Sequence, residues 1–482
     1  MPDSQVKSVY MMGIGGIAMG TLATMLREKG FRVVGSDQNL YPPMSTHLQQ
    51  LHIPLCQGFD SKHLEQHQPD LVIIGNVIRR DNPEAQFVMD RGIPYVSMVD
   101  AIDRFFLVEH ESIVVTGTHG KTTTTALLAW VLEVAGLDPS ALIGGFVKNW
   151  QRSYRLGQGR YMVLEGDEYD TAFFDKTPKF LHYRPQIAIM TSVEFDHADI
   201  YADFDAVFRA FREFVGIIPS DGQLVVNADD IHCRAVSQGC RGKVWTYGES
   251  PDADYRLLDI DYRAGEVQFT YRDLLGKTRS MVSRLPGRHN LLNTLAVIAV
   301  ATKVGITPDQ IQEALLSFQG VERRQDVLGE VNGIVIVDDF AHHPTAVRET
   351  LEAIRRYYPN RRLWALFEPR SNSSRRNVFQ EDYSRAFDRA DLIGIKEPPD
   401  LGTISLAERL DTRQLVAEIC KREREAHCFQ NADQILAFVL DRCRPGDVIL
   451  AMSNGSFDGL PRRLLAALQD GHRHSSDASP RP

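Results

Sequence analysis

The sequence predicts an α/β protein of three domains: a Rossmann-like N-terminal domain, a P-loop ATPase-like central domain with an antiparallel insertion, and a Rossmann-like C-terminal domain. Apolar runs typical of strands alternate with helix-like patterns along the chain, as in parallel sheets with crossover helices. Glycine-rich turns follow two of these strands, at Gly13 and at Gly117. The length of 482 residues suits about three domains.

The N-terminal domain is predicted to span residues 1–108. We expect strands at 6–14, 31–37 and 71–75, where apolar and β-branched residues concentrate. The glycine cluster after the first strand resembles a dinucleotide-binding fingerprint, although Ala18 occupies the third glycine position. Two ligands remain open for this cluster, a nicotinamide cofactor and the diphosphate of a UDP-sugar. The candidate ligand contacts are Gly13, Gly15, Gly16, Asp37 and Asn76.

The central domain, predicted at 109–322, begins with a phosphate-binding pattern. The β-branched run 113–116 leads into a glycine loop, and 126–131 continue as an apolar helix. A glycine loop between a strand and a helix N-terminus forms an anion site, although only two residues separate Gly117 from Gly120. A lysine here reaches the phosphates of a nucleotide, and the hydroxyl that follows can ligate Mg²⁺. We expect ATP to contact Gly117, Thr118, His119, Gly120, Lys121, Thr122 and Thr123, with Lys121 catalytic.

Two acidic clusters follow the next strands of this domain, at 165–170 and at 194–199. Each alone suits a helix cap or a solvated loop. Carboxylates at the carboxyl ends of consecutive parallel strands, downstream of a phosphate loop, indicate Mg²⁺ ligands instead. The candidate ligands are Thr122, Glu165, Glu168 and His197, and the choice between the two glutamates stays open. Glu165 and His197 are also candidate catalytic residues.

Two further features belong to the central domain. Residues 255–284 alternate between polar and apolar side chains and contain turn residues, which predicts an antiparallel insertion. Asn290 and Asn293 then share one face of an apolar helix. Asn290 suits an N-cap, and both asparagines are also placed to meet a nucleotide.

The C-terminal domain is predicted at 323–470, with strands at 334–337, 363–367, 392–395 and 448–452. Arg323 lies at its boundary, where an arginine can reach across a cleft to phosphate. Polar side chains that follow the strands suit either turns or ligand contacts. The candidate nucleotide contacts are Arg323, Asp338 and His342, and the candidate substrate contacts are Arg370, Ser371, Asn372, Ser453 and Asn454. The charge run 421–425 is interpreted as a solvated helix face, and 471–482 as a disordered tail.

Composition excludes several classes of partner. The net charge is −9 and no extended basic run occurs, so nucleic acid and anionic membranes are poor partners. We find no secretion signal and no apolar run that approaches a membrane span, so membrane insertion is not expected. The six cysteines are scattered and form no C-x-x-C pair, which predicts a reducing cytoplasm.

Up to about residue 470, this pattern resembles the Mur ligase family, whose members form amide bonds with ATP. The resemblance includes the short loop 117–123, the asparagines at 290 and 293, Arg323 or Arg324, and Asp338. It implies ATP and Mg²⁺ as cofactors and an acyl-phosphate intermediate. Several members carry a carbamylated lysine downstream of the histidine matched by His197, where this chain has Phe211.

The N-terminal glycine motif is similar to that of the branch that uses UDP-N-acetylmuramate. Within this branch, the runs 41–46, 168–175, 368–372 and 452–455 resemble members that attach a recovered murein peptide, L-alanyl-γ-D-glutamyl-meso-diaminopimelate. Members that add free L-alanine are the alternative. The resemblance implies UDP-N-acetylmuramate and the murein tripeptide as partners of a monomer or weak homodimer.

Two other classes remain as alternatives from the residues alone. An NAD(P)-dependent oxidoreductase would use the glycines at 13–20 but leaves the loop at 117–123 unexplained. A non-enzymatic nucleotide-binding switch would not need a third, substrate-bearing domain.

Overall fold

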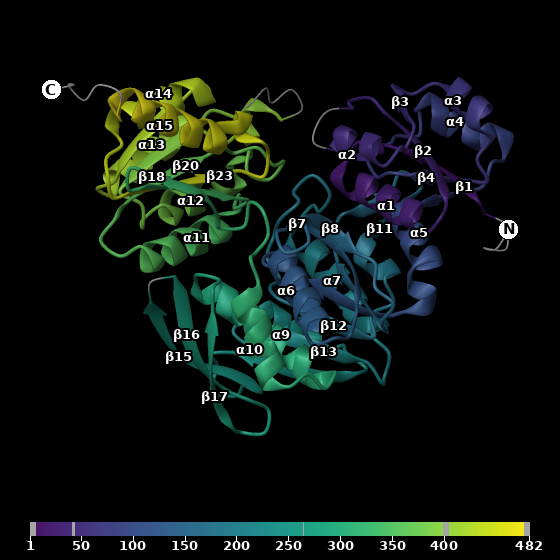
Figure 1. Cartoon of the computed structure of the whole chain (residues 1–482), viewed down its shortest axis with the longest axis horizontal. Coiled ribbons are helices and arrows are strands. Elements are labelled where there is room, and N and C mark those ends of the chain that lie inside the picture. The colour runs from purple at the N-terminus through teal and green to yellow at the C-terminus, as the bar shows by residue number, and fades with distance from the viewer. Residues whose placement is uncertain (1–5, 41–43, 264, 399–403, 477–482) are drawn as a thin grey trace. The chain divides into compact units, whose positions relative to one another are not determined.

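The computed structural model describes residues 6–40, 44–263, 265–398 and 404–476 (Figure 1). Its strands form a five-stranded, a ten-stranded and a six-stranded sheet together with a two-stranded ribbon, in agreement with the predicted three-domain α/β fold. The chain also divides into two compact units. The first unit comprises Met1–Glu194, Phe204–Arg256 and Ala296–Ala314, and the second comprises Phe195–Asp203, Leu257–Leu295 and Leu315–Pro482.

The five-stranded sheet has the order β3-β2-β1-β4-β5, and all its strand pairs are parallel. Its strands are β1 (Ser8–Met12), β2 (Arg32–Asp37), β3 (Leu55–Gln57), β4 (Leu71–Ile74) and β5 (Tyr95–Ser97). Its helices are α1 (Ile17–Glu28), α2 (Met44–Gln50), α3 (Ser61–His67), α4 (Pro83–Arg91) and α5 (Met98–Phe105). The parallel order brings the carboxyl ends of β1, β2 and β4 to one edge, where the glycine cluster lies.

The ten-stranded sheet has the order β17-β16-β15-β14-β13-β12-β6-β9-β7-β8. Its first strands are β6 (Glu111–Thr116), β7 (Ser140–Val147), β8 (Arg152–Arg155), β9 (Tyr161–Glu165), β12 (Ile187–Met190), β13 (Gln223–Asn227) and β14 (Lys243–Gly248). Strand β6 is parallel to both of its neighbours, β9 and β12. Its β-branched residues are buried because both faces of a parallel sheet are covered.

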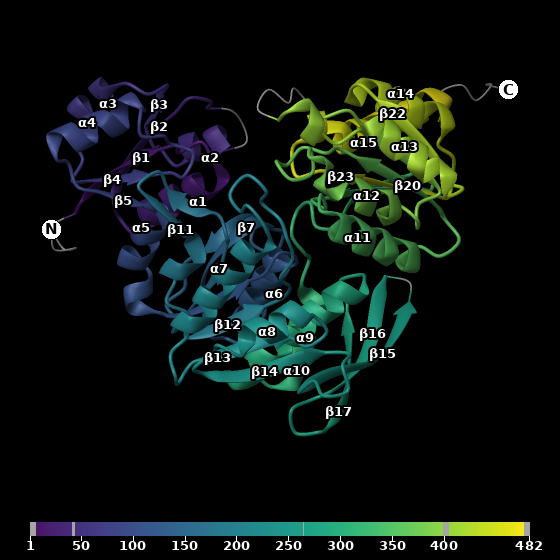
Figure 2. The same ribbon diagram turned by 180° about the vertical axis from the view of Figure 1, so that it is seen from behind.

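The predicted antiparallel insertion consists of β15 (Tyr255–Arg263), β16 (Glu266–Arg272) and β17 (Thr278–Ser283), which lie side by side in Figure 2. Strands β16 and β17 pair antiparallel, so this prediction is confirmed. The ribbon of β10 (Asp170–Ala172) and β11 (Asp175–Pro178) was not predicted. The helices of this part of the chain are α6 (Lys121–Val134), α7 (Phe204–Ile217), α8 (Ile231–Ser237), α9 (Arg288–Lys303) and α10 (Pro308–Ser317).

The six-stranded sheet has the order β18-β19-β23-β20-β21-β22, and only the edge strand β18 is antiparallel. The strands are β18 (Asp326–Val331), β19 (Ile334–Asp339), β20 (Arg362–Phe367), β21 (Leu392–Lys396), β22 (Glu425–Phe429) and β23 (Asp447–Met452). The helices are α11 (Pro344–Tyr357), α12 (Gln380–Ala386), α13 (Thr412–Lys421), α14 (Ala432–Arg442) and α15 (Leu460–Ser476).

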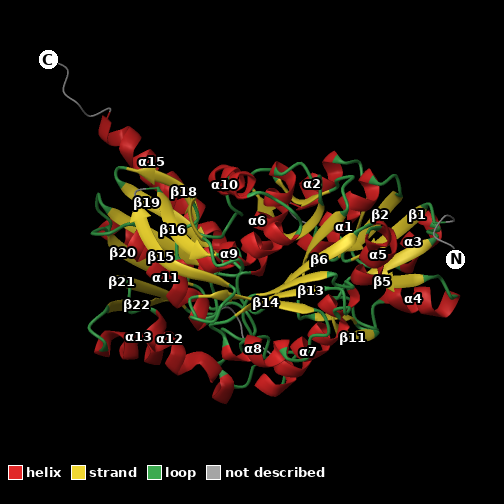
Figure 3. Cartoon of the chain, turned by 90° about the horizontal axis from the view of Figure 1, so that it is seen from below, coloured by secondary structure: helices red, strands yellow, loops and turns green. Residues whose placement is uncertain are grey.

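Helices cover both faces of the six-stranded sheet (Figure 3). One core cluster joins the sheet to α11, α12 and α13, and a second joins the opposite face to α14 and α15. Short 3₁₀ helices occur at Leu107–Glu109, Lys179–His182, Asn377–Phe379, Leu406–Glu408 and Phe457–Gly459.

Two expectations at the ends of predicted segments need comment. Helix α15 continues to Ser476, so residues 471–476 are helical where a disordered tail was predicted, and 477–482 lie outside the described residues. Residues 41–43 of the 41–46 run also lie outside the described part. Within the part that is described, no helix combines the length and the apolar character needed to cross a membrane.

Candidate active site

The phosphate loop joins the carboxyl end of β6 to the first residue of α6. Gly117 has φ +127° and Gly120 has φ +79°, conformations that L side chains rarely adopt. A Cβ at Gly117 would lie 2.2 Å from Thr191 Oγ1 and 2.8 Å from the backbone nitrogen of Ser192. Gly120 is the N-cap of α6 and has no side chain that could cap the helix. The loop therefore passes close to the neighbouring strand end and leaves the helix N-terminus suited to an anion.

Lys121 lies in the wall of this loop. Its Nζ donates to Gly117 O at 2.7 Å and pairs with Glu168 Oε2 at 2.8 Å. Burial lowers the pKa of Lys121, but the charges of Glu168 and Asp167 outweigh burial and leave this pKa above its usual range. A permanently charged ammonium group is thus held beside the helix N-terminus, where phosphate oxygens would compete for it.

The two candidate glutamates have different partners. Thr122 Oγ1 donates to Glu165 Oε1 at 2.9 Å, whereas Glu168 pairs with Lys121. The other oxygen of Glu165 accepts a hydrogen bond from Gly144 N at 2.8 Å. A Cβ at Gly144 would lie 2.7 Å from this carboxylate, so a larger residue there would displace Glu165 from its present position. A hydroxyl beside a carboxylate offers the hard oxygen ligands that Mg²⁺ prefers, so Thr122 and Glu165 fit this ion.

The segment after β12 is hydrogen-bonded to the phosphate loop. Thr118 Oγ1 accepts from Glu194 N at 2.8 Å, and Ser192 Oγ accepts from His119 N at 3.0 Å. His119 Nε2 lies 3.5 Å from Glu194 Oε2. Thr118 and His119 therefore order the loop through side-chain and backbone contacts. Glu194 begins the predicted acidic cluster at 194–199, whereas Ser192 was not predicted.

His197 belongs to the second compact unit, whereas Thr122, Glu165 and Glu168 belong to the first. Its φ of +56° is rare for a residue with a side chain, and its N–H donates to Asp196 Oδ1 at 2.7 Å. Asp196 is buried, and its Oδ2 lies 3.8 Å from His342 Nε2. Burial raises the pKa of Asp196, but the charges of three histidines (His197, His342 and His343) outweigh it and place this pKa well below its usual range. Asp196, a member of the acidic cluster at 194–199, is thus a charged anchor beside these histidines.

The asparagine face of α9 is buried. Asn290 Nδ2 donates to Pro286 O at 2.8 Å and to Gln325 Oε1 at 3.2 Å, and Asn293 is 7% exposed. Gln325 N in turn donates to Asp339 Oδ2 at 2.7 Å. Gln325 and Asp339 were not predicted, although each follows a predicted residue closely in the chain.

Arg323 and Asp338 lie together in the second unit. Arg323 Nε is 3.6 Å from Asp338 Oδ2 and has φ +60°, so its backbone is held in a strained conformation. Burial raises the pKa of Asp338 to about 6, against the opposing charge of Arg323. Arg323 also donates to Ser453 O at 2.5 Å. Arg323, a predicted nucleotide contact, and Ser453, a predicted substrate contact, therefore belong to one hydrogen-bonded cluster.

The carboxyl ends of β20, β21 and β23 surround a buried carboxylate, Glu368. It accepts from Lys396 Nζ at 2.8 Å and from Ser453 Oγ at 2.6 Å, and Arg370 Nη1 lies 3.9 Å away. Arg370 remains 44% exposed and passes so close to Gly455 that a Cβ there would lie 2.0 Å from it. Glu368 and Lys396 thus support the exposed guanidinium. Glu368 begins the 368–372 run noted in the sequence, whereas Lys396 was not predicted.

The other predicted substrate contacts have separate environments. Ser371 Oγ donates to Ser374 Oγ at 2.8 Å and serves the local turn, while Asn372 Nδ2 donates to Asp199 Oδ2 at 2.8 Å. Asn454 Oδ1 is buried without a hydrogen-bond partner among the described residues. An unpaired buried amide oxygen is costly, so this atom suits a ligand donor.

The glycine cluster of the N-terminal domain lies at the ends of β1 and β2. Gly13 has φ +81°, and Gly15 N donates to Asp37 Oδ2 at 2.9 Å. A Cβ at Gly15 would lie 3.0 Å from that carboxylate. Gly16 is the N-cap of α1, and Asn76 is exposed just after β4. The predicted residues thus gather at one sheet edge, with Asp37 engaged in ordering the turn.

Known proteins match most of the chain. The Mur ligase middle domain matches residues 115–301, the Mur ligase glutamate ligase domain matches 323–455, and the catalytic domain of the Mur ligase family matches 8–109. A solved structure of a murein peptide ligase from Psychrobacter arcticus has a TM-score of 0.72 and 34% identity, covering 96% of this chain and 98% of that chain.

Two relatives are similar over nearly their full length. The UDP-N-acetylmuramate--L-alanyl-gamma-D-glutamyl-meso-2,6-diaminoheptandioate ligase of Escherichia coli (strain K12) is 39% identical over 95% of this chain and 98% of its own. The UDP-N-acetylmuramate--L-alanine ligase of Alkaliphilus metalliredigens (strain QYMF) is 31% identical over 97% of this chain and 98% of its own. The predicted family is confirmed, and this chain belongs to the Mur ligase family.

Proposed function

We propose that this chain is an ATP-dependent amide ligase that joins L-alanyl-γ-D-glutamyl-meso-diaminopimelate to UDP-N-acetylmuramate. One observation supports the ligase chemistry above all: a charged Lys121 and the Thr122–Glu165 pair lie at the same helix N-terminus. This arrangement suits phosphoryl transfer, which needs charge neutralisation and positioning more than covalent help from the protein. The choice of peptide rests on the greater identity to the peptide-adding relative.

The proposed reaction has two steps. The lactyl carboxylate of UDP-N-acetylmuramate attacks the γ-phosphorus of ATP, ADP leaves, and an acyl phosphate forms. The free amine of the peptide then attacks the acyl carbon, the carbon–oxygen bond to phosphate breaks, and the amine loses a proton as the amide forms. Activation is required because a carboxylate and an amine do not condense in neutral water. Lys121 would neutralise charge on the transferring phosphoryl group.

Thr122 and Glu165 would hold Mg²⁺, with Glu168 and His197 as further candidate ligands. When bound, this ion would offset the negative charge that develops between the phosphates. Glu168 pairs with Lys121 here, but it could still become a metal ligand. The phosphates of ATP would then replace Glu168 as the partner of Lys121. In the second unit, Asn290, Asn293, Arg323, Asp338 and His342 remain candidate nucleotide contacts.

We assign the glycine cluster at the ends of β1 and β2 to the UDP-sugar, with the nicotinamide cofactor as the rejected alternative. The exposed Arg370, the buried Asn454 oxygen and Ser453 are candidate peptide contacts. A guanidinium matches a carboxylate bidentately, and the tripeptide carries more than one carboxylate. We expect a monomer or weak homodimer in the cytoplasm, where nucleotide substrates occur and the six cysteines remain free thiols, as they are here.

The function is tested by phosphate release with each substrate omitted in turn. We expect phosphate release from ATP to require both UDP-N-acetylmuramate and the tripeptide, and a product whose mass equals the two substrates less one water. Phosphate release that does not need UDP-N-acetylmuramate, or no release with any amine tested, would refute the proposal. Efficient release with free L-alanine would support the alanine-adding alternative, to which this chain is also similar.

A further inference from the structure

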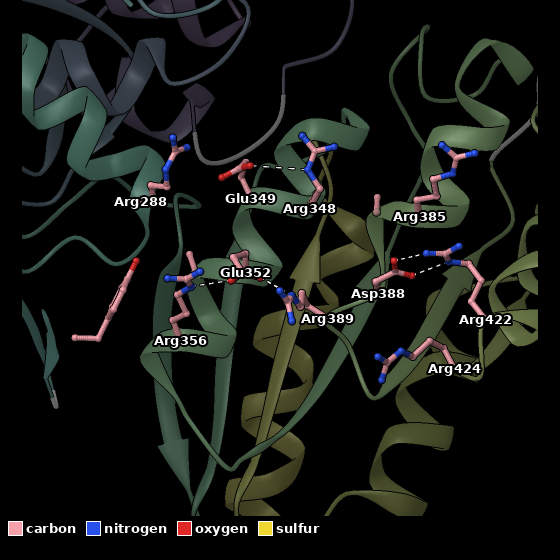
Figure 4. A pocket seen from close by; sticks show the side chains of 13 residues that line it. Arg288, Arg348, Glu349, Glu352, Arg356, Arg385, Asp388, Arg389, Arg422 and Arg424 are labelled. Carbon is pink, nitrogen blue, oxygen red and sulfur yellow. Dashed lines mark hydrogen bonds and ion pairs between the residues drawn. The ribbon is translucent and has the colours of Figure 1, made fainter. Parts of the chain in front are cut away.

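A basic cavity of about 570 Å³ lies in the second compact unit (Figure 4). Seven arginines and three carboxylates line it, and no lysine does. The arginines come from the start of α9, from α11, from α12 and the turn after it, and from the segment between α13 and β22. None of the lining residues belongs to the candidate active site described above, so the cavity is a separate feature of the molecule.

The carboxylates hold some of these arginines in place. Glu352 pairs with Arg356 at 2.7 Å and with Arg389 at 2.5 Å, so one side chain orients two guanidinium groups. Asp388 pairs with Arg422. Figure 4 shows Glu352 between Arg356 and Arg389, and Arg422 directed to Asp388. Fixed guanidinium groups lose less entropy on binding a ligand than freely rotating ones do.

The cavity nevertheless keeps an excess of positive charge. Arg348 has only a long contact to Glu349, at 3.8 Å, and Arg424 makes no hydrogen bond or ion pair within the described part of the chain. A hydrogen bond from Arg422, together with the charge of Arg424, lowers the pKa of Asp388 and keeps it charged. In a chain of net charge −9, such a local excess marks a place where anions concentrate.

The cavity also changes the interpretation of the charge run at 421–425. The sequence favoured a solvated helix face, but α13 ends at Lys421, and Arg422 and Arg424 line the cavity beyond it. Tyr262 of β15 also lines the cavity, and the Arg356 guanidinium lies over its ring, 5.6 Å from the ring centre. A concave, arginine-rich surface of this size fits a small molecule better than an extended strand of nucleic acid.

We propose that this cavity binds an oligophosphate, such as inorganic tripolyphosphate or the phosphate chain of a nucleotide. Guanidinium groups bind phosphate oxygens bidentately, and several of them converge here without enough carboxylates to balance them. An oligophosphate concentrates several charges in one small molecule, which matches this excess. A tricarboxylate of similar size carries a lower charge density and is expected to bind more weakly.

The test is calorimetric titration of the full chain with inorganic tripolyphosphate, without divalent ions. All proteins carry Lys121→Ala, so that the phosphate loop contributes little. The double variant Arg348→Gln/Arg424→Gln is expected to bind at least about tenfold more weakly than its parent. The matched control is Arg413→Gln on α13, because Arg413 is 82% exposed and does not line the cavity. Its affinity should equal that of the parent.

A second variant, expected to bind tripolyphosphate more tightly, distinguishes a specific effect on binding from misfolding. Glu349→Gln removes a carboxylate from the cavity and should tighten tripolyphosphate binding, which a damaged fold would not do. No binding by the parent, or equal binding by the parent and the double variant, would overturn the proposal. Equal affinity for tricarballylate would overturn the assignment to phosphate.

Discussion

At the scale of single residues, Lys121 has the clearest predicted effect. Lys121→Ala should lower the rate of phosphate release by at least about 10²–10³-fold, the usual effect of removing one group that stabilises a transition state. Binding of UDP-N-acetylmuramate should persist, because the glycine cluster of β1 and β2 is built from other residues. Steady-state kinetics and calorimetry provide the two readouts.

The control for this variant is Lys243→Ala, an exposed lysine on β14. It should leave both the rate and the binding unchanged. A Lys121→Ala protein that retains the wild-type rate would show that the ammonium group has no part in phosphoryl transfer.

Asp338 gives a pH-dependent prediction. Burial raises its pKa to about 6 in the folded protein, while the unfolded chain releases this proton near the ordinary value of about 3.9. Between these values the folded state binds more protons, so the free energy of unfolding falls as pH rises. The full effect is about 3 kcal/mol at most.

Asp338→Asn removes this titration. As pH rises from about 4 to about 7, the free energy of unfolding of the wild type should therefore fall relative to that of the variant. Denaturant unfolding of both proteins across this range provides the measurement. Parallel curves would mean that Asp338 does not titrate in this window.

At the scale of elements, two glycine turns should control two different ligands. Gly15→Val should weaken UDP-N-acetylmuramate binding, because a side chain there meets Asp37 and blocks approach to the backbone. Gly117→Ala should weaken ATP binding, because its Cβ would collide with Thr191 and its φ is +127°. Calorimetry with each ligand makes each variant the control for the other. If Gly15→Val lost ATP binding and kept UDP-N-acetylmuramate binding, the assignment of the two turns would be contradicted.

The strands that precede the motifs could be predicted from the sequence, but some of the other strands could not. Strands such as β6 and β23 are buried in parallel sheets, and their continuous apolar runs predict them directly. The ribbon of β10 and β11 is short, and β18 is an edge strand of mixed polarity, so neither has such a run.

The same distinction applies to the candidate site. Glycines and Lys121 were predictable because their spacing along the chain sets the loop. The support that Glu368 gives to Arg370 depends on Lys396 of β21 and Ser453 after β23, which only the folded sheet brings together. Asp196 likewise depends on His342, far away in the sequence. Such contacts between distant segments leave no local pattern.

At the scale of the whole molecule, the proposed peptide contact Arg370 offers a test of substrate choice. Its guanidinium is 44% exposed and lies 3.9 Å from Glu368, so we propose that it binds a peptide carboxylate. Arg370→Ala should lower kcat/KM for the tripeptide more than for L-alanine and so reduce the preference between them. We expect a loss of about 1.5–3 kcal/mol in transition-state binding of the peptide, the usual contribution of a hydrogen bond to a charged group.

The matched control is Arg413→Ala on α13, because the side chain of Arg413 is 82% exposed and contacts none of the candidate substrate residues. It should leave the ratio of the two kcat/KM values near that of the wild type. An equal loss for both amines in Arg370→Ala would place Arg370 in general catalysis or folding and not in peptide recognition.

The central claim is tested most directly by kcat/KM for the two amines with the wild-type protein, at saturating ATP, Mg²⁺ and UDP-N-acetylmuramate. We predict a much larger value for L-alanyl-γ-D-glutamyl-meso-diaminopimelate than for L-alanine, with phosphate release matched by the formed amide. An equal or larger value for L-alanine would contradict the claim and identify the chain as an alanine-adding member of the family.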